Sequence, residues 1–351
     1  MLEPYLIWEP SPDGHRLVYC RELLYRCSEL GATITVGTTQ DALDDKQFGL
    51  HLGPLGPQTR TFTSTIEAAR SAVAHGETLV VLSGDDKVFE LTHLPRGLRA
   101  RVLIMSRPEW TLKRRPLRSL VKFLAVRSLA VRSRTDILYL CPSAWLSDVG
   151  LSDAPDPVFL SLSTSDKDCR LPALRAQYRM SPGCTWLGVV GGISGHKNPS
   201  LVIRTAALLA ESGLSVGIAL FGPIAPRIVS SVLAELDSAE RSGVCISLHN
   251  RRFTNEELGA AIASLDVLVC AYDTDAPNST SAKAYHLGTK VVGAGSPTFL
   301  TNGQKFWTST TVELTVEGVG NAVREAISAP SRVAQTPPPP TEFADRMLGI
   351  A

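Results

Sequence analysis

Residues that could bind an anion gather just after a buried apolar segment at 267–270. Four helix-capping residues follow that segment: Asn278, Ser279, Thr280 and Ser281. Such residues open helices, whose first turn offers free backbone N–H groups and a partial positive charge that suits a phosphate. Lys283 falls in or near that first turn, where a cation opposes the helix dipole. A bound diphosphate would relieve this conflict; a solvated lysine on an ordinary capped helix is the alternative interpretation.

A second candidate anion site is the glycine-rich stretch 191–199, which follows the apolar segment 185–190. Gly191, Gly192 and Gly195 allow backbone amides to approach an oxyanion closely. Lys197 would add a point charge to the same site. The stretch matches neither the dinucleotide-binding glycine pattern nor the P-loop pattern. The stretch therefore indicates an anion site only in combination with the segment around Lys283.

The elements that must position these residues alternate between strand and helix, which predicts parallel sheets that carry ligands at the strand carboxyl ends. Short apolar segments predict strands at 5–8, 33–36, 78–82, 101–105, 137–140, 185–190, 216–221, 244–248, 267–270 and 290–293. Helical periodicity and capping residues predict helices at 16–30, 64–75, 172–180, 200–212, 227–241, 255–263, 279–287 and 318–329. Residues 40–57 are predicted to form a loop.

The length of 351 residues favours two domains rather than one. The stiff Asp-Ala-Pro-Asp-Pro segment at 153–157 is typical of a linker. We therefore expect a first domain at 1–157, a second at 158–330, and a proline-rich segment and tail at 331–351. These predictions place both candidate anion sites in the second domain.

Composition excludes several classes of function. Apolar residues make up 44% of the chain and charged residues 20%, as in globular proteins, and the net charge of +1 gives no general case for nucleic acid binding. Seven scattered cysteines without a CxxC pattern indicate free thiols in a reducing compartment, and seven scattered histidines suggest no metal site. We see no signal peptide and no run of about 18 apolar residues, so we expect a cytoplasmic protein.

The stretch 266–295 resembles the donor-site segment of glycosyltransferases with two Rossmann-like domains, the GT-B fold, and in particular the retaining family 4 group. In that family a glutamate precedes a glycine-rich turn and a second glutamate follows eight residues later. Here Asp275 stands at the first position, Lys283 at the second, and 287–292 covers the apolar-Gly-Thr continuation. The first acid is one methylene shorter and the second is replaced by a base.

The resemblance implies roles for further residues. Lys197 falls at the lysine that holds the donor diphosphate, while Gly192 stands where the family has an arginine, so Lys283 could restore the missing cation. Gly222 corresponds to a glycine that contacts the nucleotide, and Asp275 would hold sugar hydroxyls. The segment around Arg252 and Phe253 resembles the one whose backbone reads the base.

The resemblance also implies that the first domain binds the acceptor. The Gly14-His15 pair opens the first helix, where family members face the acceptor cleft; His15 could instead simply cap its helix. Asp85, after the strand 78–82, could orient a sugar hydroxyl or act as a base, or merely form a turn. The tail, with a helix predicted at 342–348, is expected to return to the first domain, as GT-B tails often do.

The stretch with the largest excess of basic over acidic residues runs from 107 to 134. It holds nine lysines and arginines against the single acid Glu109, and its apolar residues from Leu117 to Val131 can share one helical face. Such a basic amphipathic helix could lie on an anionic membrane surface. A helix that packs on its own sheet with a basic solvated face is the alternative, and nucleic acid is a weaker third interpretation.

The combined prediction is an α/β protein of two Rossmann-like domains facing a cleft. We expect it to transfer a sugar from a UDP- or GDP-linked donor to a glycan, lipid-linked or small-molecule acceptor, with retention of configuration and without cofactor or metal. Two alternatives stay open. One is a catalytically impaired nucleotide-sugar-binding protein, which the changes at Gly192 and Lys283 support. The other is a sugar-nucleotide epimerase of the same fold.

Overall fold

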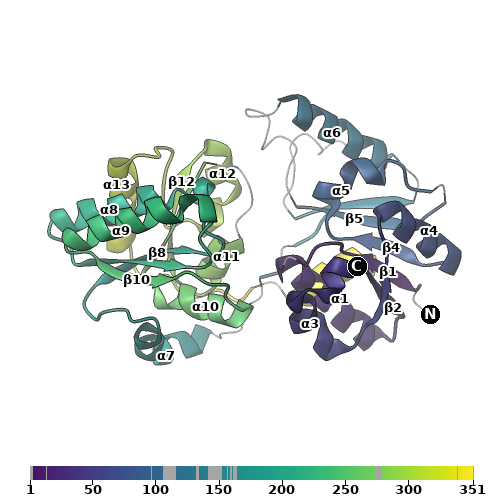
Figure 1. Cartoon of the computed structure of the whole chain (residues 1–351), viewed down its shortest axis with the longest axis horizontal. Helices are drawn as coiled ribbons and strands as arrows, with labels where there is room; N and C mark the ends of the chain where they lie inside the picture. Colours follow the sequence, from purple (N-terminus) through teal and green to yellow (C-terminus); the bar gives the residue numbers. More distant parts are fainter. Residues whose placement is uncertain are drawn as a thin grey trace. The chain divides into compact units, whose positions relative to one another are not determined.

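The computed structural model describes residues 3–12, 14–95, 97–105, 116–131, 134–140, 152–155, 157–158, 160, 164–273, 279–337 and 339–350. The chain divides into two compact units (Figure 1). Unit 1 comprises Met1–Pro157 together with Pro338–Ala351, and unit 2 comprises Val158–Pro337. Each unit contains its own parallel sheet.

Unit 1 is built on a seven-stranded parallel sheet with the order β3-β2-β1-β4-β5-β6-β7. Its strands are β1 (Tyr5–Trp8), β2 (Ile34–Thr38), β3 (Gln58–Thr61), β4 (Thr78–Val81), β5 (Ala100–Ile104), β6 (Thr135–Tyr139) and β7 (Ser152–Asp153). The four residues of β1 are all buried, and β1 pairs with β2 on one side and β4 on the other. The carboxyl end of β1 therefore lies near the middle of the sheet edge, where α1 begins.

Helices cover both faces of the unit 1 sheet (Figure 1). They are α1 (Gly14–Leu30), α2 (Gln40–Asp44), α3 (Lys46–Leu52), α4 (Thr65–His75), α5 (Gly84–Leu91), α6 (Pro116–Ala130) and α14 (Pro340–Leu348). Ala68 of α4, Val88 of α5 and Val126 of α6 belong to one apolar cluster with the strands. α1, α3 and α14 lie on the other face, where the rings of Tyr19 and Phe343 are 5.0 Å apart.

The prediction of a loop at 40–57 is wrong, because α2 and α3 occupy most of this range. Asp45, one of the aspartates that suggested a loop, is a helix cap, as is Thr39 just before the segment. Thr39 Oγ1 accepts a hydrogen bond from the backbone N–H of Ala42, and Asp45 Oδ1 accepts one from that of Gln47. Capping side chains satisfy N–H groups that the first turn of a helix leaves without partners, which is why these short helices form.

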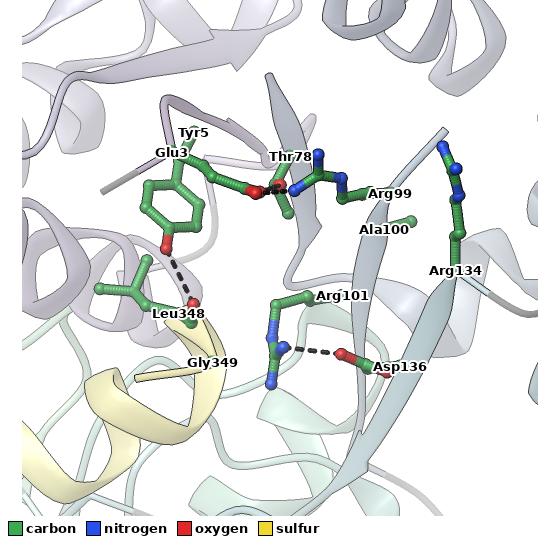
Figure 2. Close-up of a pocket in the computed structure, with 10 residues that line it drawn as sticks. All are labelled: Glu3, Tyr5, Thr78, Arg99, Ala100, Arg101, Arg134, Asp136, Leu348 and Gly349. Carbon is green, nitrogen blue, oxygen red and sulfur yellow. Dashed lines mark hydrogen bonds and ion pairs between the residues drawn. The ribbon is translucent and has the colours of Figure 1, made fainter. Parts of the chain in front are cut away.

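The carboxyl-terminal helix α14 is fixed to the amino-terminal edge of the unit 1 sheet (Figure 2). The hydroxyl of Tyr5 donates to the carbonyl oxygen of Leu348 at 2.8 Å. Arg101 donates to the carbonyl oxygen of Arg346 at 2.8 Å and pairs with Asp136 at 2.6 Å. These bonds satisfy carbonyl groups that the last turn of a helix leaves without intrahelical partners.

Unit 2 is built on a six-stranded parallel sheet with the order β10-β9-β8-β11-β12-β13. Its strands are β8 (Thr185–Val190), β9 (Val216–Phe221), β10 (Cys245–His249), β11 (Val267–Tyr272), β12 (Lys290–Gly295) and β13 (Ser309–Thr311). Its helices are α7 (Thr164–Gln177), α8 (Pro199–Glu211), α9 (Val229–Arg241), α10 (Asn255–Ser264), α11 (Ser279–His286), α12 (Pro297–Asn302) and α13 (Val316–Ser328).

Two apolar clusters, one on each face, hold the unit 2 sheet between its helices (Figure 1). One cluster joins the sheet to α8, α9 and α13, and the other joins it to α7, α10, α11 and α12. β8, β9 and β11 are buried along nearly their whole length. The prediction of strands at exactly 185–190 and 216–221 is confirmed, whereas α7 begins eight residues before the predicted 172 and contains Pro172 in its interior.

Candidate functional site

The order of the strands in unit 2 marks the place where a ligand would bind. β8 and β11 are neighbours at the centre of the sheet, but the chain continues from β8 to β9 on one side and from β11 to β12 on the other. In open α/β sheets, ligands bind outside the carboxyl ends of the strands at such a switch point. The glycine-rich stretch follows β8 and α11 follows β11, so the fold brings both candidate anion sites to this point.

Lys197 is the most perturbed cation of the site. It ends a short 3-10 turn (Gly195–Lys197), its side chain is buried, and only 8% of the residue is exposed. Its ammonium nitrogen donates to the carbonyl oxygen of Val190 at 2.7 Å and lies 5.8 Å from the centre of the Tyr272 ring. Burial disfavours the charged form and lowers the pKa of Lys197 to about 8. A perturbed group of this kind at a ligand-binding edge is typical of a functional residue.

Gly191, Lys197 and Thr280 meet at the switch point. A Cβ atom placed on Gly191 would lie 3.2 Å from Lys197 Nζ and 3.8 Å from Thr280 Oγ1. Gly191 also has a φ of 85°, which favours glycine. Gly222, which follows β9, has a φ of 141°, and a side chain there would run into the carbonyl oxygen of Gly191. Because both residues are glycines, the turn after β8 and the turn after β9 can approach each other closely beside Lys197.

The start of α11 faces the same point. Thr280 and Ser281 are buried, whereas Ser279, the first residue of α11, is exposed. Gly288, with a φ of 68°, ends the helix as predicted. Asp275 and Asn278 lie outside the described residues, so their predicted contacts with a sugar and a phosphate stay predictions.

The structure corrects the expected position of Lys283. It is the fifth residue of α11 and lies in the last turn of this eight-residue helix, where the dipole favours a cation. The side chain is buried, and its ammonium donates to Oδ1 of Asn255, the first residue of α10. The predicted conflict with the dipole is therefore absent. Lys283 instead joins α11 to the start of α10.

The predicted base-reading segment leads into α10. The ring of Phe253 lies 6.0 Å from that of Phe221, at the end of β9, and the guanidinium of Arg251 lies 4.3 Å above the Phe253 ring. Arg252 is exposed. Thr254 and Glu257 form a capping box at the start of α10, in which they exchange side-chain and backbone hydrogen bonds.

Gly192, at the position of the family arginine, borders open space. A Cβ atom on this residue would meet no atom within 4 Å. The next residue, Ile193, forms a bridge with Ile224, and the backbone N–H of Ile224 donates to Asn250 Oδ1 at 2.8 Å. The loop after β8 is therefore fixed beyond Gly192, with room beside the glycine itself.

The candidate acceptor residues of unit 1 lie at the carboxyl edge of its sheet. Gly14 and His15 begin α1, the helix that follows β1, but their side-chain positions lie outside the described part of the chain. Asp85 is engaged on both carboxylate oxygens: Oδ2 accepts from the backbone N–H of Met105 at 2.6 Å, and Oδ1 from Lys122 Nζ at 2.7 Å. These bonds favour an anchoring role, joining α5 to β5 and α6, over the predicted contact with an acceptor.

An acidic residue that we did not predict lies at the same carboxyl edge of the unit 1 sheet. Glu9, directly after β1, is buried, and its Oε1 accepts from the backbone N–H of Ser11 at 3.0 Å. Arg16 lies 3.9 Å from Glu9 and donates to Asp86 Oδ2 at 2.5 Å. An acid directly after a fully buried strand was the sequence signal, because that position falls at the carboxyl edge of a parallel sheet.

A cavity of about 580 Å³ lies at the opposite, amino-terminal edge of the unit 1 sheet (Figure 2). Three arginines line it, but Arg99 pairs with Glu3, Arg101 with Asp136, and Arg134 donates to the carbonyl oxygen of Gly97. Figure 2 shows these guanidinium groups pointing in different directions. The cavity therefore reflects the attachment of α14 rather than a focused anion site.

The described residues contain neither a cluster of metal ligands nor a membrane-spanning helix. Within them, no three side chains of His, Cys, Asp or Glu come together as metal ligands would. No helix in the same part of the chain is long and apolar enough to cross a bilayer.

Comparisons with known proteins identify the fold. The sequence matches no protein-family model and no curated protein. Solved structures are similar over nearly the whole chain. HepE of Anabaena, solved with UDP, is 13% identical with a TM-score of 0.67, and the match covers 100% of this chain and 94% of HepE. Related HepE structures contain UDP with glucose, or UDP-glucose.

Two further structures agree. Sucrose-phosphate synthase from Thermosynechococcus elongatus is 12% identical with a TM-score of 0.64, covering 99% of this chain and 94% of that one. WaaG, a glycosyltransferase of lipopolysaccharide biosynthesis, is 13% identical with a TM-score of 0.61, covering 99% and 95%. The predicted fold class, two Rossmann-like domains as in GT-B glycosyltransferases, is confirmed.

Proposed function

We propose that this protein is a glycosyltransferase that takes its sugar from a nucleotide-linked donor bound to unit 2. The observation that carries the proposal is the meeting of Lys197, Thr280 and the Gly191 backbone at the switch point of a parallel sheet. The similarity to HepE, which was solved with UDP and with UDP-glucose, supports a donor of this class. UDP- and GDP-linked sugars are the first donors to test.

In this proposal Lys197 and the first turn of α11 stabilise the departing diphosphate. Charge on the diphosphate grows as the bond to the sugar breaks, so preorganised donors at that point lower the barrier. Lys197 is suited to the task because its ammonium is buried and its pKa is lowered to about 8. A bound diphosphate would favour its charged form, and backbone N–H groups in the first turn of α11 would add further donors.

The remaining donor contacts follow the same arrangement. We assign Gly222 to a close backbone approach, Phe253 and Arg252 to the nucleoside, and Asp275 and Asn278 to the sugar and the diphosphate. Lys283 would contact the diphosphate or the ribose while Asn255 holds its ammonium in place. Its position between α10 and α11 supports a contact on the nucleoside side of the site.

We assign acceptor binding to the carboxyl edge of unit 1, where Gly14 and His15 begin α1. The Arg16–Asp86 pair and the buried Glu9 add charged groups suited to sugar hydroxyls. His15 is the candidate for proton transfer there. We further propose that the reaction retains the configuration of the sugar and uses Lys197 and the α11 amides in place of a divalent ion.

The outer face of α6 supports an anionic membrane surface as a partner. Leu117 is 74% exposed, and Leu120, Val121, Leu124 and Val131 are exposed with it at helical spacing. The inner face of α6 packs on the unit 1 core through Ala125, Val126 and Leu129. An apolar stripe facing solvent, within a stretch that has nine cations and one acid, matches an interfacial helix. A lipid-linked acceptor would be found at such a surface.

One observation favours a second function, a nucleotide-sugar-binding protein without transferase activity. Gly192 leaves open the place of the family arginine, and Lys283 already donates to Asn255. Of the two lysines described at the donor site, Lys197 is then the one that remains for the diphosphate. In this case the protein would bind the donor but transfer no sugar.

A panel of ligands and a turnover assay separate these functions. UDP, GDP, TDP and CMP are first compared by thermal shift, because a ligand at 100-fold its Kd adds about 2.7 kcal/mol to stability. The matching radiolabelled nucleotide sugar is then incubated with membranes and with soluble glycans. Label that moves to an acceptor supports the transferase, whereas binding with intact donor supports the binding protein. An epimerase would alter the sugar without an acceptor.

A further inference from the structure

Two cysteine thiols meet at the amino-terminal edge of the unit 2 sheet, opposite the candidate donor site. Cys184 directly precedes β8, and Cys245 is the first residue of β10. Their sulfur atoms are 3.1 Å apart, and both residues are only partly buried. A disulfide needs a sulfur separation of about 2.05 Å, so closure by about 1 Å would bond the pair.

The chain reaches this geometry although β9 lies between β8 and β10. The segment that leads from α7 into β8 runs over the start of β10. Ser247 of β10 donates to the carbonyl oxygen of Tyr178 at 2.6 Å, and Trp186 of β8 donates to that of Ser181 at 3.0 Å. The segment is fixed at both strands, so it holds Cys184 beside Cys245.

The surroundings of the two sulfurs differ. A hydrogen bond joins them, and this bond, followed by burial, raises the pKa of Cys245, which disfavours its thiolate. Ser215 Oγ donates to Cys184 Sγ at 3.5 Å. Cys184 is therefore the better placed of the two to attack first, because the thiolate is the nucleophile in thiol chemistry.

The other described cysteines differ in access. Cys20, Cys27 and Cys270 are at most 1% exposed. Burial raises the pKa of Cys27 to about 12 and that of Cys20 further. Among the five cysteines whose side chains the structure describes, a small oxidant therefore meets the Cys184–Cys245 pair first.

We propose that Cys184 and Cys245 form a reversible disulfide on reaction with a small-molecule disulfide such as oxidised glutathione. The Cys184 thiolate attacks one glutathione sulfur, which forms a mixed disulfide and releases the first glutathione as thiolate. Cys245 passes its proton to solvent and attacks Cys184 Sγ, releasing the second glutathione. The protein loses two hydrogen atoms, and one oxidised glutathione becomes two reduced ones.

The bond would join the start of β8 to the start of β10, the two strands that flank β9. The carboxyl ends of these strands lead to Gly191, Gly222 and Asn250, so the cross-link would hold the framework of the donor site from its far edge. A bridge across a long chain segment also reduces the entropy of the unfolded state. We expect the melting temperature to rise by about 5 °C or more.

The test uses the full chain, reduced and then exposed to oxidised glutathione. Intact mass and peptide mapping should show the loss of two hydrogens and a linked pair of peptides containing Cys184 and Cys245. Cys245→Ser should instead accumulate one glutathione on residue 184, since no second thiol can displace it. Cys184→Ser should react much more slowly at Cys245, by about tenfold. Reductant should restore the original mass and melting temperature.

Each alternative result counts against the proposal. A wild-type protein that accumulates stable mixed disulfides, or that links other cysteines, lacks the proposed pair. Equal adduct formation in both serine variants would overturn the assigned roles. Melting curves of both reduced variants confirm that they fold, and Cys270→Ser should oxidise like the wild type.

Discussion

The ammonium nitrogen of Lys197 donates a hydrogen bond of 2.7 Å to the carbonyl oxygen of Val190, the last residue of β8. A flexible side chain is thereby folded back onto the strand that precedes it, beside Gly191 and Thr280. A buried ammonium is costly without an anion nearby. The arrangement holds a cation ready for a ligand at a cost to the stability of the ligand-free protein.

The pH dependence of stability should reveal this cost. The pKa of Lys197 is about 8 in the folded protein, against 10.5 ordinarily. Between these values the unfolded chain holds the proton and the folded one does not, so unfolding becomes harder as pH rises from about 8 to about 10.5. The gain is on the order of 3 kcal/mol at most. Urea unfolding at several pH values should show the gain in wild type and its loss in Lys197→Met; parallel curves would contradict the burial of the charge.

Gly222→Ala should disturb the loop that presents Lys197. An alanine Cβ would run into the carbonyl oxygen of Gly191, and the φ of 141° adds strain. We expect a loss of about 2–4 kcal/mol in unfolding free energy. Gly213→Ala is the matched control, because Gly213 also has a positive φ, of 88°, but a Cβ there meets open space. Equal losses in the two variants, measured by denaturant unfolding, would show that the contact between the glycines is unimportant.

Lys283→Met should weaken both stability and donor binding. Removing the buried ammonium leaves Asn255 without this donor, which costs about 1–3 kcal/mol. If Lys283 also contacts the donor, nucleoside diphosphate affinity falls tenfold or more, about 1.4 kcal/mol. Arg175→Met is the control, because Arg175 pairs with Asp266 and donates to Ser264 at the other edge of the same sheet. A Lys283 variant that binds nucleotide like this control would exclude the ligand contact.

Flotation with lipid vesicles tests the proposed membrane face. Leu117→Glu with Leu124→Glu places two acids on the exposed stripe of α6, and binding to vesicles rich in anionic lipid should fall at least tenfold. Leu233→Glu is the control, because Leu233 is also exposed but lies on α9. Wild-type binding should weaken in high salt. Failure to bind anionic vesicles, or a lipid-free dimer that the double variant abolishes, would reject this partner.

The sequence predicted most strands and helices of the two sheets because its strongest signals are local. The apolar runs at 185–190 and 216–221 are as long as the strands they form, and Ser279 and Gly288 are the residues that open and end α11. Each depends on backbone preferences within a few residues. The alternation of such elements is enough to predict parallel sheets with a site at their carboxyl ends.

The roles of individual charges were harder to predict, because their partners are distant in sequence. Lys283 donates to a residue 28 positions away, and Asp85 accepts from partners 20 and 37 positions away. No local pattern identifies these pairs. The start of α7 was predicted wrongly because proline is typical of a first turn, whereas Pro172 lies inside the helix.

Calorimetric titration of UDP and GDP into wild type and Lys197→Met tests the central proposal most directly. Lys290→Met is the matched control, because Lys290 also donates to backbone carbonyls, of Ile327 and Ala329, but at the amino-terminal edge of the sheet. We predict that one nucleotide binds wild type and the Lys290 variant alike, and that Lys197→Met binds it at least tenfold more weakly, about 1.4 kcal/mol. Folded Lys197→Met protein with wild-type affinity would contradict a donor site built on Lys197.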